Sequence, residues 1–172
     1  MYQWLEEDMK AIDKEKTDWT IAFFHHPPYT HGTHNSDKEI EHIEMRENLI
    51  PLLEKYNIDF VFGGHSHTYE RSILMSGHYG YSNTYDEKLH AVDSKDGDPS
   101  KSGAYHKREK GSVYCVAGNS GKIGPFRAPH LPFMKKNFSQ FGSVILEADG
   151  KTMKITAIDD KQNVLDSYEV KK

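Results

Sequence analysis

The stretch FVFGGHSHTYER, residues 60–71, decides the fold. Its first three residues continue an apolar, β-forming run that starts at Ile58, and such a run predicts a short buried strand. The glycines Gly63 and Gly64 end this strand and permit a tight turn, in which the backbone can approach an ion without crowding by a Cβ atom. A strand followed by a glycine turn and two imidazoles is typical of a ligand site at the carboxyl edge of an α/β sheet.

A second strand of the same kind lies towards the amino terminus. The run at residues 19–24 predicts a buried strand, which ends where two prolines, Pro27 and Pro28, cannot continue a sheet ladder. Between the two strands, residues 39–56 show a helical pattern. Pro51 would cost about 3 kcal/mol in a helix interior, so we expect a break or an early-turn position near it.

The rest of the chain predicts an α/β fold with mixed sheets in one domain, residues 1–172. A short amphipathic helix is expected near Trp4 to Ile12, before the first strand. Residues 75–111 are polar and without periodicity, which is typical of a long functional or mobile loop. A run of antiparallel strands is predicted at about 112–117, 142–148, 152–159 and 164–170.

The composition is notable for eleven histidines and one cysteine. With 22 Lys and Arg against 26 Asp and Glu, the net charge is -4. The chain therefore has no excess of positive charge that would attract nucleic acid or an anionic membrane. No apolar stretch approaches about 18 residues, so a transmembrane helix is excluded. Cys115 alone excludes a disulfide framework and a multi-cysteine zinc site, so histidine and carboxylate must hold any metal.

Three histidines follow the two predicted strands directly. His65 and His67 stand two residues apart, so in an extended segment they face one side and can reach one metal or two adjacent metals. Such a pair is also often a solvated or core-capping pair. His25, at the end of the other strand, favours the metal hypothesis because both strand ends meet at one sheet edge.

The remaining histidines have simpler interpretations. His26 is expected to point away from its neighbour His25, because adjacent side chains of an extended segment face opposite sides. His42 lies on a charged helix, and His78 lies in a polar stretch, so both are expected to be solvated. Cys115 is expected to be a packed thiol in an apolar strand.

Two of these segments together resemble a known family. FHHPPY at residues 24–29 and GHSHTYER at residues 64–71 resemble the carboxyl half of the purple acid phosphatase branch of the calcineurin-like metallophosphoesterases. Shorter supporting matches are QWLEED at 3–8, Met45-Arg46, PLLEKY at 51–56, and Val113-Tyr114 before Ala117-Gly118. The resemblance implies that the chain forms the carboxyl half of a four-layer α/β/β/α sandwich, a partial catalytic domain.

The resemblance also implies roles for individual histidines. His25 and His65 match ligands of the family's divalent metal, and His67 matches a ligand of its iron. The implied cofactor is a dinuclear centre of iron with zinc or manganese. The family's phosphate-binding or proton-donating histidine lies nine or ten residues beyond the first ligand, which selects His34 here, with His31 as the alternative. Glu70 and backbone carbonyls are candidate acceptors for the second N–H of the ligating imidazoles.

Several motifs of the family do not occur in this sequence. Its D-x-G, G-D-x-x-Y and G-N-H-[DE] motifs are absent, since Gly118-Asn119 is followed by Ser120. The bridging carboxylate, the tyrosine and the asparagine ligand are therefore expected from a missing amino-terminal half. We expect little or no phosphatase activity from the 172 residues alone. Because the family is usually exported, a periplasmic or extracellular location is expected.

The leading functional hypothesis is dimetal-dependent hydrolysis of phosphate monoesters. A phosphodiesterase or nucleotidase of the same superfamily is the first alternative, with residues 75–111 expected to build the substrate wall that would separate the two. The second alternative, from a different class, is a non-catalytic metal-binding module that keeps the histidines.

Overall fold

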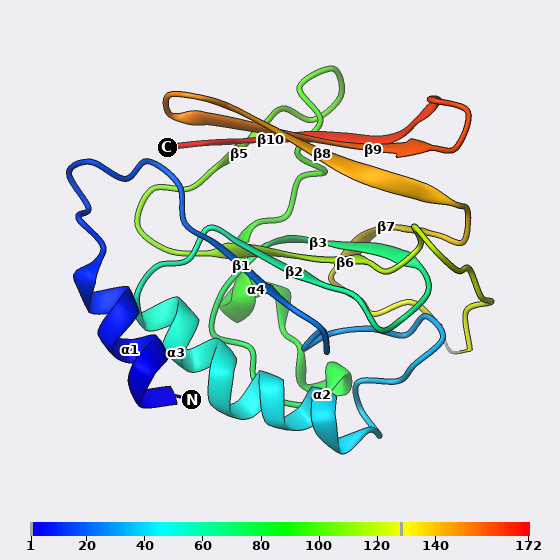
Figure 1. Ribbon diagram of the computed structural model, residues 1–172, viewed down its shortest axis with the longest axis horizontal. Coiled ribbons are helices and arrows are strands. Elements are labelled where there is room, and N and C mark those ends of the chain that lie inside the picture. The colour runs from blue at the N-terminus through cyan, green and yellow to red at the C-terminus, as the bar shows by residue number, and fades with distance from the viewer. Residues whose placement is uncertain (1, 128) are drawn as a thin grey trace.

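The computed structural model describes residues 2–127 and 129–172. Figure 1 shows three layers, with helices below, a six-stranded sheet in the middle and a four-stranded sheet above. The mixed α/β class predicted from the sequence is confirmed. Among the described residues, no helix has the length and apolar character needed to cross a bilayer.

The six-stranded sheet holds the strands that carry the histidines. Its order is β1-β2-β6-β3-β4, and β7 also pairs with β3. Its strands are β1 (Ile21–Phe24), β2 (Phe60–Gly63), β6 (Ser112–Ala117), β3 (Tyr69–Met75), β4 (Ala91–Asp93) and β7 (Met134–Phe138). The prediction that residues 112–117 join an antiparallel run is wrong in part, because β6 runs parallel to β2 and only its other edge pairs antiparallel, with β3.

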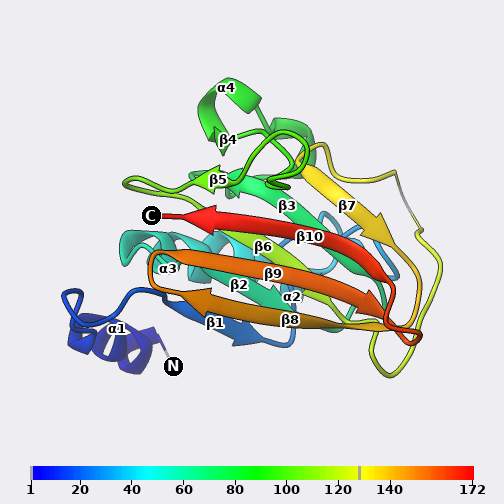
Figure 2. The ribbon, with the colours of Figure 1, turned by 90° about the horizontal axis from the view of Figure 1, so that it is seen from above.

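The four-stranded sheet confirms the three predicted carboxyl-terminal strands. β8 (Gly142–Asp149), β9 (Thr152–Asp159) and β10 (Val164–Lys171) pair antiparallel in sequence order. The short β5 (Tyr105–His106) adds to β10 in parallel. Figure 2, seen from above, shows this sheet covering β1, β2, β6 and β3.

The helical layer follows the predicted boundaries closely. α1 (Tyr2–Ala11) precedes β1, and α2 (Ile40–Glu44), a π-helical segment (Met45–Leu49) and α3 (Ile50–Lys55) form one continuous helical stretch. Pro51 lies in the first turn of α3, directly after the π-helical segment, as predicted. Residues 75–111 are not one long loop, since they contain a 3-10 turn (Ser82–Thr84), α4 (Glu87–His90), β4 and β5.

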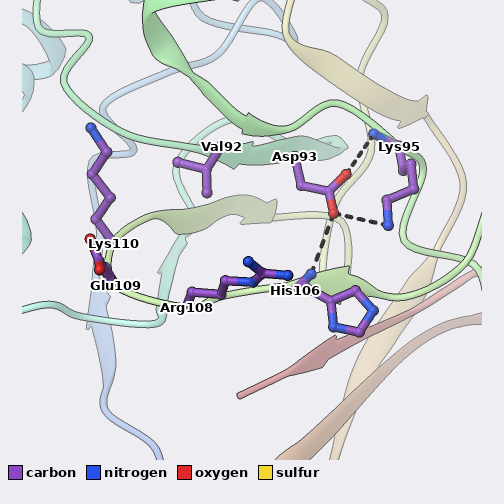
Figure 3. Close-up of a pocket in the computed structure, with 7 residues that line it drawn as sticks. All are labelled: Val92, Asp93, Lys95, His106, Arg108, Glu109 and Lys110. Atoms are coloured by element: carbon purple, nitrogen blue, oxygen red, sulfur yellow. Dashed lines mark hydrogen bonds and ion pairs between the residues drawn. The ribbon is translucent and has the colours of Figure 1, made fainter.

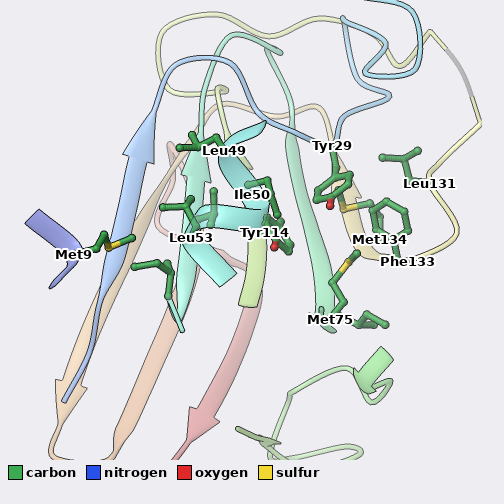
Figure 4. Close-up of a cluster of buried hydrophobic side chains, with 13 residues drawn as sticks. Met9, Tyr29, Leu49, Ile50, Leu53, Met75, Tyr114, Leu131, Phe133 and Met134 are labelled. Carbon is green, nitrogen blue, oxygen red and sulfur yellow. The ribbon is translucent and has the colours of Figure 1, made fainter. Parts of the chain in front are cut away.

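Alternate side chains of the central strands face two separate cores. Phe60 and Phe62 of β2 pack against the upper sheet, whereas Val61 packs against the helices. Figure 4 shows the helix-side core, where residues of the α2–α3 stretch meet Tyr114 of β6 and aromatic side chains such as Tyr29. Cys115 is buried in the core between the sheets, which confirms that it is a packed thiol.

A buried ion pair joins the two sheets. Arg71 of β3 donates to the Asp166 carboxylate of β10 from Nε at 2.6 Å and from Nη2 at 3.1 Å, and both side chains are almost fully buried. The Tyr69 hydroxyl donates to the same carboxylate at 2.9 Å. The Arg71 guanidinium also lies over the Tyr168 ring, 4.3 Å from its centroid. The ion pair and this contact explain how Arg71 is accommodated in a strand that is buried along its whole length, a feature that β-propensity does not predict.

Candidate functional site

The candidate site lies at the carboxyl edge of the three parallel strands. Phe24, Gly63 and Val116 are in register across β1, β2 and β6, so the loops that follow these strands leave the sheet together. They surround an open pocket of about 540 Å³. Its lining includes His25, His34, His65, His67, Gly118 and Lys122. The structure therefore brings the four histidines singled out from the sequence to one pocket.

The turn after β2 is tighter than the sequence suggests. His65 has a φ of 57°, in the left-handed region, and the Ser66 N–H donates to the Gly64 carbonyl at 2.6 Å. The extended geometry expected for His65 and His67 is therefore wrong, although both side chains still reach the pocket. Gly118 makes this turn possible, because a Cβ atom there would lie 2.0 Å from the Ser66 carbonyl oxygen.

The predicted metal ligands are not equally close to one another. His25 Nε2 and His65 Nδ1 lie 3.0 Å apart, and the His34 ring centroid lies 3.9 Å from that of His65. Two groups of side chains have nitrogen or carboxylate oxygen atoms within 4.8 Å of one another; one is His25, His26 and His65, and the other is His34, Glu39, His42 and His65. His67 lines the pocket but belongs to neither of these groups.

Two histidines that were not expected at this site from the sequence, His26 and His42, also lie there. The His26 ring centroid is 4.5 Å from that of His65, so the expectation that His26 points away is wrong. The chain bends directly after β1 instead of continuing as a strand, which removes the alternation assumed for His25 and His26. His42 is fully buried and not solvated, because α2 packs it against the loop after β1, where its Nδ1 donates to the Pro27 carbonyl at 2.6 Å.

The electrostatic environment favours neutral imidazoles in this pocket. Burial, reinforced by the neighbouring imidazoles, lowers the pKa of His65 to about 4. Burial also lowers the pKa values of His42 and His67. A metal ion binds the neutral form of histidine, so these groups are available as ligands even at mildly acidic pH.

Glu70 supports the loop that carries His34. Its buried carboxylate accepts hydrogen bonds from the Thr30 hydroxyl, from the His31 backbone N–H at 3.0 Å and from the Thr68 hydroxyl at 3.0 Å. Burial raises the pKa of this carboxyl group. Glu70 therefore joins two loops, and of the candidate acceptors for the ligating imidazoles it is the wrong one.

The two histidines proposed as the proton donor, His34 and His31, have different hydrogen-bond partners and different positions. The His31 Nδ1 donates to the Pro129 carbonyl at 2.7 Å, and its ring does not line the pocket. His34 lines the pocket, and its Nδ1 lies 2.7 Å from the Glu39 carboxylate. Of the two candidates left open by the sequence, the structure thus places only His34 beside His65.

Residues 75–111 build a different pocket. β3 and β6 are antiparallel, with Met75 opposite Ser112, so the connection between them leaves from the edge opposite the histidines. Figure 3 shows the pocket there, in which Asp93 accepts from the Lys95 backbone N–H at 3.1 Å and pairs with its ammonium group at the same distance. The expected substrate wall from this segment is therefore wrong, and residues 118–122 wall the histidine pocket instead.

His78 is buried in this connecting segment, so the expectation that it is solvated is wrong. Burial lowers the pKa of His78 to about 4, below its usual value of 6.5. The unfolded chain therefore binds more protons than the native state between these values, and the free energy of unfolding should fall as the pH falls from 6.5 towards 4. Urea unfolding at pH 7.5 and pH 5.0 measures this loss. We expect a smaller loss for His78→Gln; an equal loss would contradict the assignment.

The chain is similar to known proteins in both sequence and fold. The model of the family "Calcineurin-like phosphoesterase" matches residues 1–69. Over 71 residues the chain is 45% identical to "Probable purple acid phosphatase 20" of Arabidopsis thaliana, an alignment that covers 41% of this chain and 16% of that protein. The chain is similar to purple acid phosphatases. The resemblance inferred from the sequence motifs is confirmed.

A second relative and a solved structure extend this result. The "Fe(3+)-Zn(2+) purple acid phosphatase 12" of Arabidopsis thaliana is 35% identical over 75 residues, which are 44% of this chain and 15% of that protein. The structure of purple acid phosphatase PPD1 from yellow lupin (Lupinus luteus) seeds covers 99% of this chain with a TM-score of 0.74 at 20% identity. This likeness shows that the chain has the fold of the corresponding part of the lupin protein. The chain covers 28% of the lupin protein.

Proposed function

We propose that this chain provides the histidine ligands and the proton donor of a dinuclear metal site that hydrolyses phosphate monoesters. The observation that carries the proposal is the convergence of His25, His34, His65 and His67 on one open pocket at the carboxyl edge of the sheet. The names of the relatives, which are phosphatases, support the same chemistry.

The proposed metal ligands follow the geometry of the pocket. His25 and His65, with nitrogens 3.0 Å apart, would hold one divalent ion, and His67 would hold the second ion, an iron. The divalent partner of that iron would be zinc or manganese, and one relative is named for iron and zinc. Such ions supply a hydroxide nucleophile and neutralise the phosphate when they are bound. The lowered pKa values of His65 and His67 fit this role, because only neutral imidazoles bind.

His34 is the proposed proton donor. Its Nδ1 lies 2.7 Å from the Glu39 carboxylate, and this contact fixes the orientation of the ring. The opposite nitrogen, Nε2, is then the atom that gives a proton to the departing alkoxide. Lys122, also in the lining, adds a positive charge for the anionic substrate.

The remaining ligands of such a centre would come from an amino-terminal half that carries the bridging carboxylate and the asparagine. We therefore expect the reading frame upstream of Met1 to encode G-D-x-x-Y and G-N-H-[DE], preceded by an export signal. A frame without these motifs would exclude the enzyme and leave a non-catalytic metal-binding module. The 172 residues alone, loaded with Fe³⁺ and Zn²⁺, should show little or no phosphatase activity.

The test of His34 uses the complete protein and two substrates. Glycerol phosphate has a poor alkoxide leaving group that needs a proton, whereas p-nitrophenyl phosphate does not. We expect His34→Ala to lower kcat for glycerol phosphate by about 100-fold or more and to affect p-nitrophenyl phosphate much less. His31→Ala is the matched control and should retain the activity on both substrates. Equal losses of His34→Ala on the two substrates would contradict the proton-donor role, and faster hydrolysis of a phosphodiester would favour the alternative substrate class.

A further inference from the structure

His42 has a buried nitrogen that the proposed function leaves unexplained. The side chain is fully buried, and its Nδ1 donates to the Pro27 carbonyl at 2.6 Å, so Nε2 carries the lone pair. This Nε2 atom has no hydrogen-bond partner among the described residues. Its carboxylate neighbour, Glu39 Oε2, lies 3.9 Å away. A buried acceptor without a partner destabilises the fold, which indicates that a further group binds to this nitrogen.

Three further ligand atoms surround this nitrogen. His34, Glu39 and His65 each offer one nitrogen or oxygen atom, and all four atoms of the group lie within 4.8 Å of one another. Four ligands at zinc bond lengths would lie about 3.3 Å apart in a tetrahedron. The four ligand atoms are therefore at most about 1.5 Å further apart than the ligands of a tetrahedral zinc ion. One pair is already closer than that, since Glu39 Oε2 lies 2.7 Å from His34 Nδ1.

The elements that carry these ligands suit a metal site. Glu39 is the N-cap residue of α2 and His42 lies in the first turn of that helix, so the two side chains lie side by side, 3.9 Å apart. His34 comes from the loop before α2, and His65 from the turn after β2. The hydrogen bond from His42 Nδ1 to a backbone carbonyl is the contact that typically orients a metal-binding histidine and makes Nε2 the ligand.

We propose that His34, Glu39, His42 and His65 bind a single divalent transition-metal ion of the zinc type. Three imidazoles and one carboxylate form a complete tetrahedral set of nitrogen and oxygen ligands. All four belong to this chain, whereas the dinuclear centre of the proposed function requires ligands from elsewhere. Glu39 as a ligand and His42 in any role are outside that function, so this site goes beyond it.

The site shares two residues with the proposed phosphatase centre. An ion bound here occupies His65, a proposed ligand, and His34, the proposed proton donor. Binding at this position and catalysis therefore exclude one another, and the ion would act as an inhibitor of the assembled enzyme.

The test measures metal binding to the purified 172-residue chain and needs no activity. Titration with Co²⁺ should give the intense visible absorption of a tetrahedral ion at one equivalent, and calorimetry with Zn²⁺ should give one site. We expect Glu39→Gln and His42→Gln each to weaken Zn²⁺ binding by about 10-fold or more. His26→Gln is the matched control, since His26 belongs only to the neighbouring histidine group, and it should change the affinity by less than about threefold.

Circular dichroism of the metal-free variants establishes that they are folded. Should His42→Gln fail to fold, Glu39→Gln decides the outcome, because Glu39 is partly exposed and its amide analogue keeps the hydrogen bond from the Asn35 N–H. Loss of binding in His26→Gln but not in Glu39→Gln would move the ion to His25, His26 and His65 and overturn the proposal. Absence of Zn²⁺ binding would also overturn it, with water as the partner of His42. Neither result depends on the phosphatase assay.

Discussion

Asp166→Ala should lower the free energy of unfolding by about 3–5 kcal/mol, because it leaves the Arg71 guanidinium buried without a counter-charge. The Asp166 carboxylate accepts two hydrogen bonds from Arg71 and one from Tyr69. Both charged side chains are almost fully buried, so water cannot replace these hydrogen bonds when the carboxylate is removed. The two sheets are joined at this point, so the loss should act on the whole sandwich. Urea unfolding followed by circular dichroism and by tryptophan fluorescence measures it.

The matched control is an exposed ion pair in the same upper sheet. Glu147 of β8 and Lys154 of β9 lie 3.8 Å apart, and about half of each side chain is exposed. Glu147→Ala should change the free energy of unfolding by less than about 1 kcal/mol. A loss in Asp166→Ala no greater than in this control would show that Arg71 finds other partners and that the buried pair does not join the sheets.

Gly118→Ala should disrupt the histidine pocket and destabilise the protein by about 1–3 kcal/mol. The added methyl group would lie 2.0 Å from the Ser66 carbonyl oxygen and 2.9 Å from its carbon, which are backbone atoms and cannot rotate away. The turn carrying His65 and His67 must therefore move relative to His25. We expect Zn²⁺ binding to weaken by about tenfold, as for the loss of a group that orients a ligand. Calorimetry and urea unfolding report the two effects.

Gly121→Ala provides the control in the same loop. No atom lies within 4 Å of a Cβ at Gly121, and this residue also lines the pocket. We expect its stability to equal that of the parent chain or to rise slightly, since alanine restricts the unfolded state. Equal behaviour of Gly118→Ala and Gly121→Ala would contradict the view that close backbone approach shapes the pocket.

The local sequence predicts much of this fold because its hydrophobic runs end at prolines, glycines or other turn residues. β1 and β2 are short apolar runs that end at prolines or glycines, and β8 to β10 alternate with clear turns between them. β3 escapes prediction because its polar residues are buried with distant partners. Arg71, for example, pairs with Asp166, which lies 95 residues further along the chain. No local pattern contains that information.

The candidate site likewise contains some residues that the sequence predicts and others that it does not. His25, His65 and His67 are predictable because they follow strands directly, and parallel strands end at one edge. His42 is not predictable from its charged surroundings, because its burial depends on how α2 packs against the loop at Pro27. The signal that could have found it is its spacing of three residues from Glu39, which brings a carboxylate before the helix close to an imidazole in its first turn.

The direction of β3 has a consequence for how the two ends of the molecule can vary. Because β3 and β6 are antiparallel, the segment from Met75 to Ser112 begins and ends at the edge away from the histidines. Insertions in its exposed turns, such as the turn at residues 99–102, can lengthen this segment without altering the spacing of the three strand ends that surround the pocket. The sheet thus separates a geometrically constrained edge, where the histidines lie, from an edge whose exposed turns tolerate insertion.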